Sequence, residues 1–129
     1  LGAEGVQIGT RFALTEESSA SPVFKDYCLS LGEGDTKLLL KKLAPTRLVK
    51  NAFREAVEKA EDSGASAEDL RTLLGRGRAK KGIFEGDLEE GELEIGQVSA
   101  IISRRQSVAE VMDELVAAYQ RAAKKDYLF

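Results

Sequence analysis

The sequence predicts a mostly helical α/β chain with one short strand near its N-terminus. Apolar residues recur at the helical spacing in three stretches, which cover residues 22–31, 49–60 and 108–119. Only one short apolar run between glycines, Val6–Ile8, is typical of a strand. A strand of this length cannot satisfy its backbone hydrogen bonds alone, so we expect its sheet partners outside this sequence or in another chain.

Two helix starts are predicted in the first quarter of the chain. Thr15 followed by Glu16 and Glu17 combines a capping hydroxyl with acidic residues in a first turn. Ser21 followed by Pro22 repeats the signal, because proline is favoured at the first position of a helix. The apolar face of this second helix, which a glycine-rich run ends, consists of Phe24, Tyr27, Cys28 and Leu31.

The middle of the chain predicts two further helices and one ambiguous segment. Residues 36–43 contain leucines that fit a strand or a buried helical turn equally well. An amphipathic helix is predicted over Val49–Ala60. Ser66 and Asp69 predict a capping box for a short helix that ends near Leu74. Two shorter features follow, a helical turn over 78–84 and an acidic, glycine-bounded turn over 86–91.

The C-terminal part predicts two helices. The first of these helices is predicted to begin within residues 96–102. Ser107 and Glu110 predict a capping box in front of the second, and Lys124–Lys125 suit its C-terminal end, where the helix dipole favours cations. The apolar face of this last helix consists of Val108, Val111, Met112, Leu115 and Tyr119.

Composition excludes several classes of function. The net charge is −3 and no aromatic residues interleave with a basic stripe, which argues against a nucleic-acid partner. No apolar run is long enough to span a membrane. The single cysteine cannot form an internal disulfide, and the absence of histidine removes the commonest zinc ligand and the usual general base. We therefore expect a cytoplasmic protein with no metal site, no nucleic-acid partner and no membrane partner.

The run Gly5–Phe12 is the segment that indicates chemistry, because a strand candidate ends there in Gly9-Thr10 before a helix. A glycine lets an anionic ligand approach the backbone closely, and amides at a helix start can hold a phosphate. The Thr10 hydroxyl adds a donor. In parallel α/β barrels phosphates are bound beside the last strands. A tight turn with no ligand explains the same residues, so composition leaves both interpretations open.

The run Leu1–Phe12 resembles the flavin-phosphate motif of the nitronate monooxygenase (2-nitropropane dioxygenase) family, which includes the FMN-dependent enoyl-ACP reductases of type II. IMP dehydrogenase-like barrels carry a similar turn, so that alternative stays open. The resemblance continues in the same order through Thr15–Ser18, Pro22, Arg47–Asn51, Gly86-Asp87, Gly91 and Gly96-Gln97.

The resemblance implies the C-terminal fragment of a TIM-like (β/α)8 barrel. Residues 1–21 would hold the last barrel strand and the FMN-phosphate turn, residues 22–95 an inserted helical and β segment, and residues 96–129 helices that return to the barrel. The only methionine is Met112, so we expect a piece of a longer protein that is inactive by itself.

The resemblance also assigns candidate site residues. Those that match FMN-contacting positions are Gln7, Ile8, Gly9 and Thr10, and those expected near the active site are Gly96 and Gln97. The catalytic histidine of the family lies upstream, so no catalytic residue is expected in this chain.

Two reactions follow from the resemblance. In a reductase, NAD(P)H reduces FMN, which then reduces the double bond of an enoyl thioester. In a monooxygenase, a nitronate reduces FMN and oxygen reoxidises it. The expected partners are a small-molecule or acyl-carrier-protein-linked substrate and a second copy in a homodimer. An alternative from a different class is a non-enzymatic helical binding or assembly module.

Overall fold

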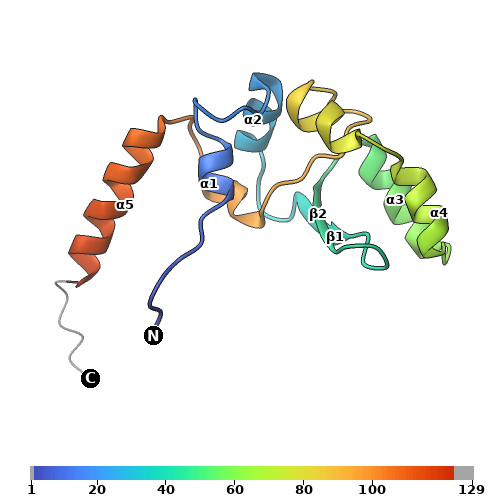
Figure 1. Cartoon of the computed structure of the whole chain (residues 1–129), viewed down its shortest axis with the longest axis horizontal. Helices are drawn as coiled ribbons and strands as arrows, with labels where there is room; N and C mark the ends of the chain where they lie inside the picture. The colour runs from blue at the N-terminus through green and yellow to red at the C-terminus, as the bar shows by residue number, and fades with distance from the viewer. Residues whose placement is uncertain (1, 124–129) are drawn as a thin grey trace.

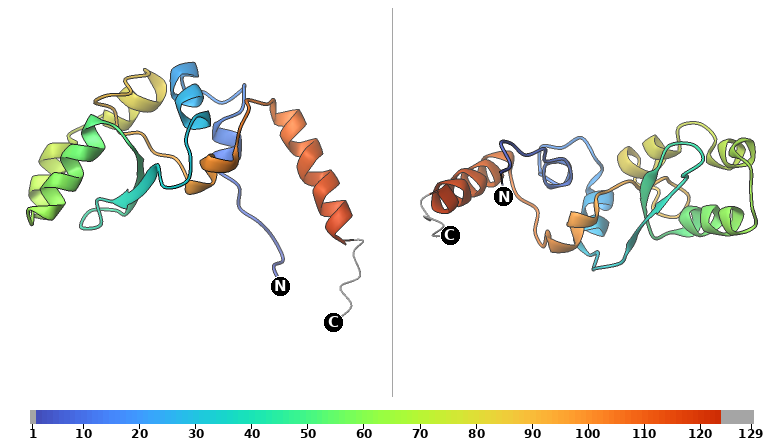
Figure 2. Two further views of the ribbon diagram at one scale, coloured as in Figure 1. Left: turned by 180° about the vertical axis from the view of Figure 1, so that it is seen from behind. Right: turned by 90° about the horizontal axis from the view of Figure 1, so that it is seen from below.

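The computed structural model describes residues 2–123 of the chain and forms an arch. Helices α3 and α4 lie at one end of the arch, and α5 lies at the other end beside the N-terminal segment (Figure 1). Views from behind and from below show the same arrangement (Figure 2). The elements are α1 (Thr10–Ala13), α2 (Pro22–Leu29), β1 (Thr36–Leu39), β2 (Thr46–Val49), α3 (Ala52–Asp62), α4 (Ala67–Leu74), the π-helical turn η1 (Lys80–Phe84), the 3₁₀ helix η2 (Gln97–Ile101) and α5 (Val108–Ala123).

The strand predicted at Val6–Ile8 is not formed in this chain. Residues 2–9 have no regular secondary structure and lead away from the arch (Figure 1), and Val6 is 83% exposed. A strand is defined by hydrogen bonds to a neighbouring strand. Within residues 2–123 the only sheet is the two-stranded pair of β1 and β2, so this segment has no partner to pair with.

The helix predicted to begin at Thr15 is also wrong. Helix α1 lies earlier, and residues 14–20 form turns and bends. The Thr15 hydroxyl donates a hydrogen bond to the Phe12 carbonyl oxygen (2.7 Å), so it closes the end of α1 instead of capping a new helix. The Glu17 carboxylate accepts the Val108 N–H (3.0 Å), so this acidic residue caps the distant helix α5.

The ambiguous segment 36–43 contains strand β1, which pairs antiparallel with β2 so that Thr36 lies opposite Val49. Val49 was predicted on a helix face, and this prediction is wrong because the residue ends β2. Helix α3 begins only after Asn51, whose side chain accepts the Arg54 N–H at 2.9 Å. The N-cap therefore decides where the strand ends and the helix starts.

The other predicted helix starts are confirmed. The helical turn predicted over 78–84 is the π-helical turn η1, and the helix predicted over 96–102 is the short 3₁₀ helix η2. No helix within residues 2–123 is long and apolar enough to cross a bilayer. Lys124–Lys125 lie outside the described residues. The confirmed caps are Ser21 with the Phe24 amide, the Ser66–Asp69 capping box and the reciprocal bonds of Ser107 and Glu110.

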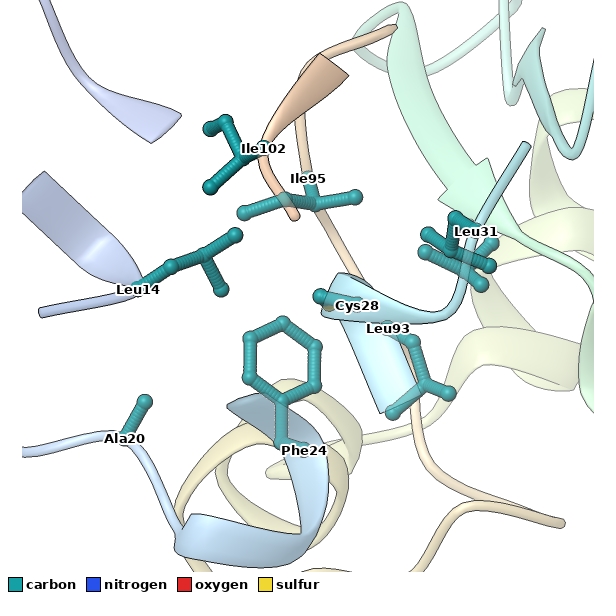
Figure 3. Packing of buried hydrophobic residues seen from close by; sticks show 9 residues of the cluster. Leu14, Ala20, Phe24, Cys28, Leu31, Leu93, Ile95 and Ile102 are labelled. Atoms are coloured by element: carbon teal, nitrogen blue, oxygen red, sulfur yellow. The ribbon is translucent and has the colours of Figure 1, made fainter. Parts of the chain in front are cut away.

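Two apolar cores lie along the arch. In the first, side chains from the loop before α2, from α2 and from both flanks of η2 point toward one another (Figure 3). This core joins residues from all three predicted segments, 1–21, 22–95 and 96–129, whose boundaries stay a prediction. Its members are Leu14, Ala20, Phe24, Cys28, Leu31, Val49, Leu93, Ile95 and Ile102. The second core consists of Leu39, Leu40, Leu48, Phe53, Val57 and Leu70.

The acidic turn over 86–91 is clamped onto η1 and onto the start of α3. A Cβ atom built on Gly91 would lie 2.2 Å from the Gly82 Cα and 2.4 Å from the Asp87 carbonyl oxygen. The Asn51 amide donates to the carbonyl oxygens of Leu88 (3.1 Å) and Gly91 (2.7 Å). The Asn51 side chain joins the acidic turn to the start of α3, and the contact between Gly91 and Gly82 joins the same turn to η1. We call this arrangement the Asn51–Gly91 clamp.

Directly after the clamp, Glu92 is only 8% exposed. Burial, followed by the charge of exposed Glu94 and a hydrogen bond with it, raises the pKa of Glu92 to about 7. Because the folded-state pKa lies above the unfolded value, the contribution of Glu92 to stability is fully present below pH 4.5 and is lost as the pH rises through 7.

The free energy of unfolding should therefore fall by roughly 2 kcal/mol between pH 5 and pH 8 because of this carboxyl. Urea titrations at both pH values measure the difference. Glu92→Gln should remove it, whereas Glu94→Gln should remove only part, because burial is the larger cause. An equal pH dependence in the protein and in Glu92→Gln would show that another group titrates.

Candidate functional site

The structure brings two of the predicted groups of residues together. The backbone N–H of Gly96, just before η2, donates a hydrogen bond to the Thr10 Oγ1 at 3.0 Å. The two residues are 86 positions apart, and Thr10 is half-buried at the start of α1. No hydrogen bond among residues 2–123 uses the Thr10 hydroxyl as a donor. Its proton therefore remains available to an acceptor outside the chain.

Backbone donors lie beside this hydroxyl. The amides of Phe12 and Ala13 donate to the Gly9 carbonyl oxygen, each at 3.0 Å. The amides of Thr10 and Arg11 occupy the first turn, where a helix offers no internal acceptor, and no other acceptor is found for them within residues 2–123. The start of α1 thus presents two N–H groups and one O–H group.

Nothing within residues 2–123 requires glycine at position 9. The φ of Gly9 is −107°, which any residue adopts, and a Cβ atom built there meets no atom within 4 Å. The absence of a side chain leaves the backbone open to a closely approaching ligand. This open backbone is the feature that a bound phosphate needs.

A groove of about 1230 Å³ opens beside these donors. Its volume accommodates a cofactor-sized ligand, because ligand pockets measure roughly 300–1000 Å³. All four residues predicted to contact FMN line it. The groove is lined by Gln7, Ile8, Gly9, Thr10 and Arg11 from the N-terminal segment, by Val98, Ile101 and Ile102 from η2 and its C-terminal cap, and by Val111, Asp113, Glu114, Leu115, Ala117, Ala118 and Arg121 from α5.

Gln97 lies on the other side of η2 from this groove. It lines a second groove of about 710 Å³ together with Arg47 and the loop 32–34. Val98 and Ile101 line both grooves, so η2 forms the ridge between them. The structure thus places Gly96 beside Thr10, while it places its neighbour Gln97 in a separate groove.

The charge at the groove was not predicted from the sequence. Arg11 donates to Gln106 Oε1 (2.5 Å) and to Glu114 Oε2 (2.6 Å), which joins α1 to α5. Arg104 donates to the other oxygen of Glu114 at 2.8 Å. The hydrogen bond from Gln106, followed by the charges of the two arginines, lowers the pKa of the Glu114 carboxyl. Only the tertiary structure joins Arg11 to Gln106 and Glu114, because each partner lies about a hundred positions away along the chain.

Comparison with known proteins shows the family of this chain. The sequence model of the family described as nitronate monooxygenase matches residues 1–118. The chain belongs to the nitronate monooxygenase family. Over 116 residues it is 32% identical to a probable nitronate monooxygenase of Bacillus subtilis (strain 168), a match that covers 89% of this chain and 33% of that protein. The family resemblance inferred from the sequence is thereby confirmed, and the non-enzymatic module is not favoured.

Solved structures of FabK from Thermotoga maritima share the fold of this family member. One is 29% identical with a TM-score of 0.78, and the match covers 95% of this chain and 39% of that chain. A mutant of the same protein is 25% identical with a TM-score of 0.77, covering 95% and 36%. The chain therefore spans between a third and two fifths of the length of these relatives.

Proposed function

We propose that this chain is the C-terminal part of an FMN-dependent oxidoreductase and that the start of α1 holds the flavin phosphate. The observation that carries the proposal is the donor set in the groove, where the Thr10 hydroxyl and the amides of Thr10 and Arg11 lie beside an open glycine. Membership of the nitronate monooxygenase family supports the same assignment.

The donors suit a phosphate for electrostatic reasons. Hydrogen bonds to an ionised acceptor are about twice as strong as neutral ones, and Arg11 also lines the groove. Glu114 holds the Arg11 side chain toward α5, so the amides and the hydroxyl would make the direct contacts. A bound flavin would supply the electron transfer, while these residues bind and orient it.

Exposed apolar surface supports a longer protein. On α5, Val111 is buried, but Met112 is 45% exposed, Val116 47% and Tyr119 74%. Val6 on the N-terminal segment is more exposed still. Met112, Val116 and Tyr119 recur at the helical spacing on α5, and an apolar helix face of this kind normally packs against other protein. We propose that the remainder of a TIM-like barrel covers it and that residues 6–8 form a strand there.

Two reactions are compatible with the proposal, namely reduction of an enoyl thioester by NAD(P)H and oxidation of a nitronate by oxygen. Steady-state assays of the full-length protein separate them. NAD(P)H consumption that depends on crotonyl thioester identifies the reductase, and oxygen uptake that depends on nitronate identifies the monooxygenase. Turnover in neither assay would count against both.

Thr10→Val in the full-length protein should raise the dissociation constant for FMN about 10- to 100-fold, because one hydrogen bond to a charged group is lost. Flavin fluorescence during titration measures the affinity. Thr10→Ser, which keeps the hydroxyl, should stay within a few-fold of the unchanged protein. Equal FMN affinity in Thr10→Val and the unchanged protein would remove Thr10 from the flavin site.

A further inference from the structure

We propose that Gly96 is a positioning residue for the flavin phosphate, which it orients through the hydroxyl of Thr10. The inference rests on the proposed function and adds to it a residue that lies 86 positions after Thr10 in the chain. Gly96 does not line the groove, so it would act without touching the cofactor.

Two observations show that Gly96 and the Thr10 hydroxyl are in close contact. The Gly96 N–H donates to the Thr10 Oγ1 at 3.0 Å. A Cβ atom built on Gly96 would lie 2.5 Å from the same oxygen, closer than real Cβ contacts. The next neighbours are the Thr10 Cβ at 3.6 Å and the Val98 Cγ1 at 3.9 Å, both at ordinary contact distances. Any side chain at position 96 would therefore displace the hydroxyl.

The backbone gives no other reason for glycine at position 96. Its φ of −70° and ψ of 152° are open to every residue type. The absence of a Cβ is thus explained by the approach of one atom, the Thr10 Oγ1.

The geometry also restricts where the hydroxyl proton can point. A threonine hydroxyl has one proton and two lone pairs, and the Gly96 N–H engages one lone pair. The proton cannot point at that donor, so it points elsewhere. The same bond holds the Thr10 Oγ1 in position before a ligand arrives, and the hydroxyl proton can rotate toward the ligand. Such preorganisation raises affinity by avoiding an ordering cost at binding.

The test measures the affinity of the full-length protein for FMN and for riboflavin, which lacks the phosphate. Gly96→Ala should weaken FMN binding about tenfold, because the Thr10 hydroxyl is displaced, and should leave riboflavin binding unchanged. Weaker binding of both flavins would indicate general damage to the fold and would overturn the inference.

A double-mutant cycle shows whether the effect passes through Thr10. Thr10→Ala should weaken FMN binding by a similar factor, and Gly96→Ala added to it should cause no further loss. The matched control is Gly32→Ala, whose Cβ would meet only the Asp35 Oδ2 at 3.6 Å and which should bind FMN normally.

The outcomes separate this inference from the proposed function. If Thr10→Ala weakens FMN binding and Gly96→Ala does not, the inference is wrong and the flavin site stands. If neither variant changes FMN binding, the phosphate site itself is wrong. If Gly96→Ala does not fold, the double variant, in which the clash is absent, should fold and bind FMN as Thr10→Ala does. Misfolding of the double variant as well would overturn the inference.

Discussion

Gly91→Ala should lower the free energy of unfolding by about 3 kcal/mol, at the upper end of the usual cost of overpacking. The added Cβ would lie 2.2 Å from the Gly82 Cα and 2.4 Å from the Asp87 carbonyl oxygen. Both atoms belong to the backbone, so no rotation of a side chain can relieve the clash. Urea unfolding followed by circular dichroism measures the loss.

Two other glycines serve as controls for this variant. At Gly82 the nearest atom is the Leu93 Cδ2 at 2.7 Å, and the nearest backbone atoms, the Glu92 carbonyl oxygen and the Gly91 Cα, lie at 3.0 Å. Gly82→Ala should therefore cost less than Gly91→Ala, whose backbone contacts are shorter. Gly32→Ala should change stability by less than about 0.5 kcal/mol, as surface substitutions usually do. Equal stability of Gly91→Ala and Gly32→Ala would mean that η1 and the acidic turn are not in contact in solution.

Asn51→Ala should also cost about 3 kcal/mol. Loss of the N-cap bond to the Arg54 amide accounts for about 1 kcal/mol. The carbonyl oxygens of Leu88 and Gly91 would each lose a donor, at about 1 kcal/mol apiece. The same unfolding experiment measures the total.

Asn51→Ser divides that total into its parts. Serine keeps an oxygen that can cap α3 but has no amide to reach the two carbonyl groups. It should therefore recover only about 1 kcal/mol of the loss. Full recovery by serine would show that the bonds to Leu88 and Gly91 contribute nothing.

The clamp explains two of the residues on which the family resemblance rests. Asn51 and Gly91 belong to the motifs shared with the nitronate monooxygenase family, yet neither lines the groove beside α1. Their roles in this structure are to cap α3 and to allow close backbone contact. A motif residue in this family can therefore be structural, which limits what a motif alone says about a site.

Patterns confined to a few neighbouring residues were interpreted correctly. The cap of α2 and the capping boxes of α4 and α5 depend on groups three residues apart, and the structure contains all three. The apolar face of α2 is likewise confirmed, with Phe24 and Cys28 buried in the first core. Burial raises the pKa of the Cys28 thiol to about 12, so it is a structural thiol.

Interpretation failed where a residue bonds to a distant partner. Thr15 and Glu17 looked like a local helix start, but Glu17 caps α5 from 91 positions away. Val49 has the spacing of a helix face and instead pairs with Thr36 in the sheet. Intrinsic preferences are small, so a tertiary bond of about 1 kcal/mol can override them.

The sequence by itself determined the caps of α2, α4 and α5 and the glycine-threonine turn, because each depends on residues within one or two turns of the chain. Only the tertiary structure decided that Gly96 bonds to Thr10, that Glu114 holds Arg11 and that Asn51 holds the acidic turn. The physical reason is that these contacts join segments 40 or more positions apart. No local preference encodes such pairs, and packing of the whole chain selects them.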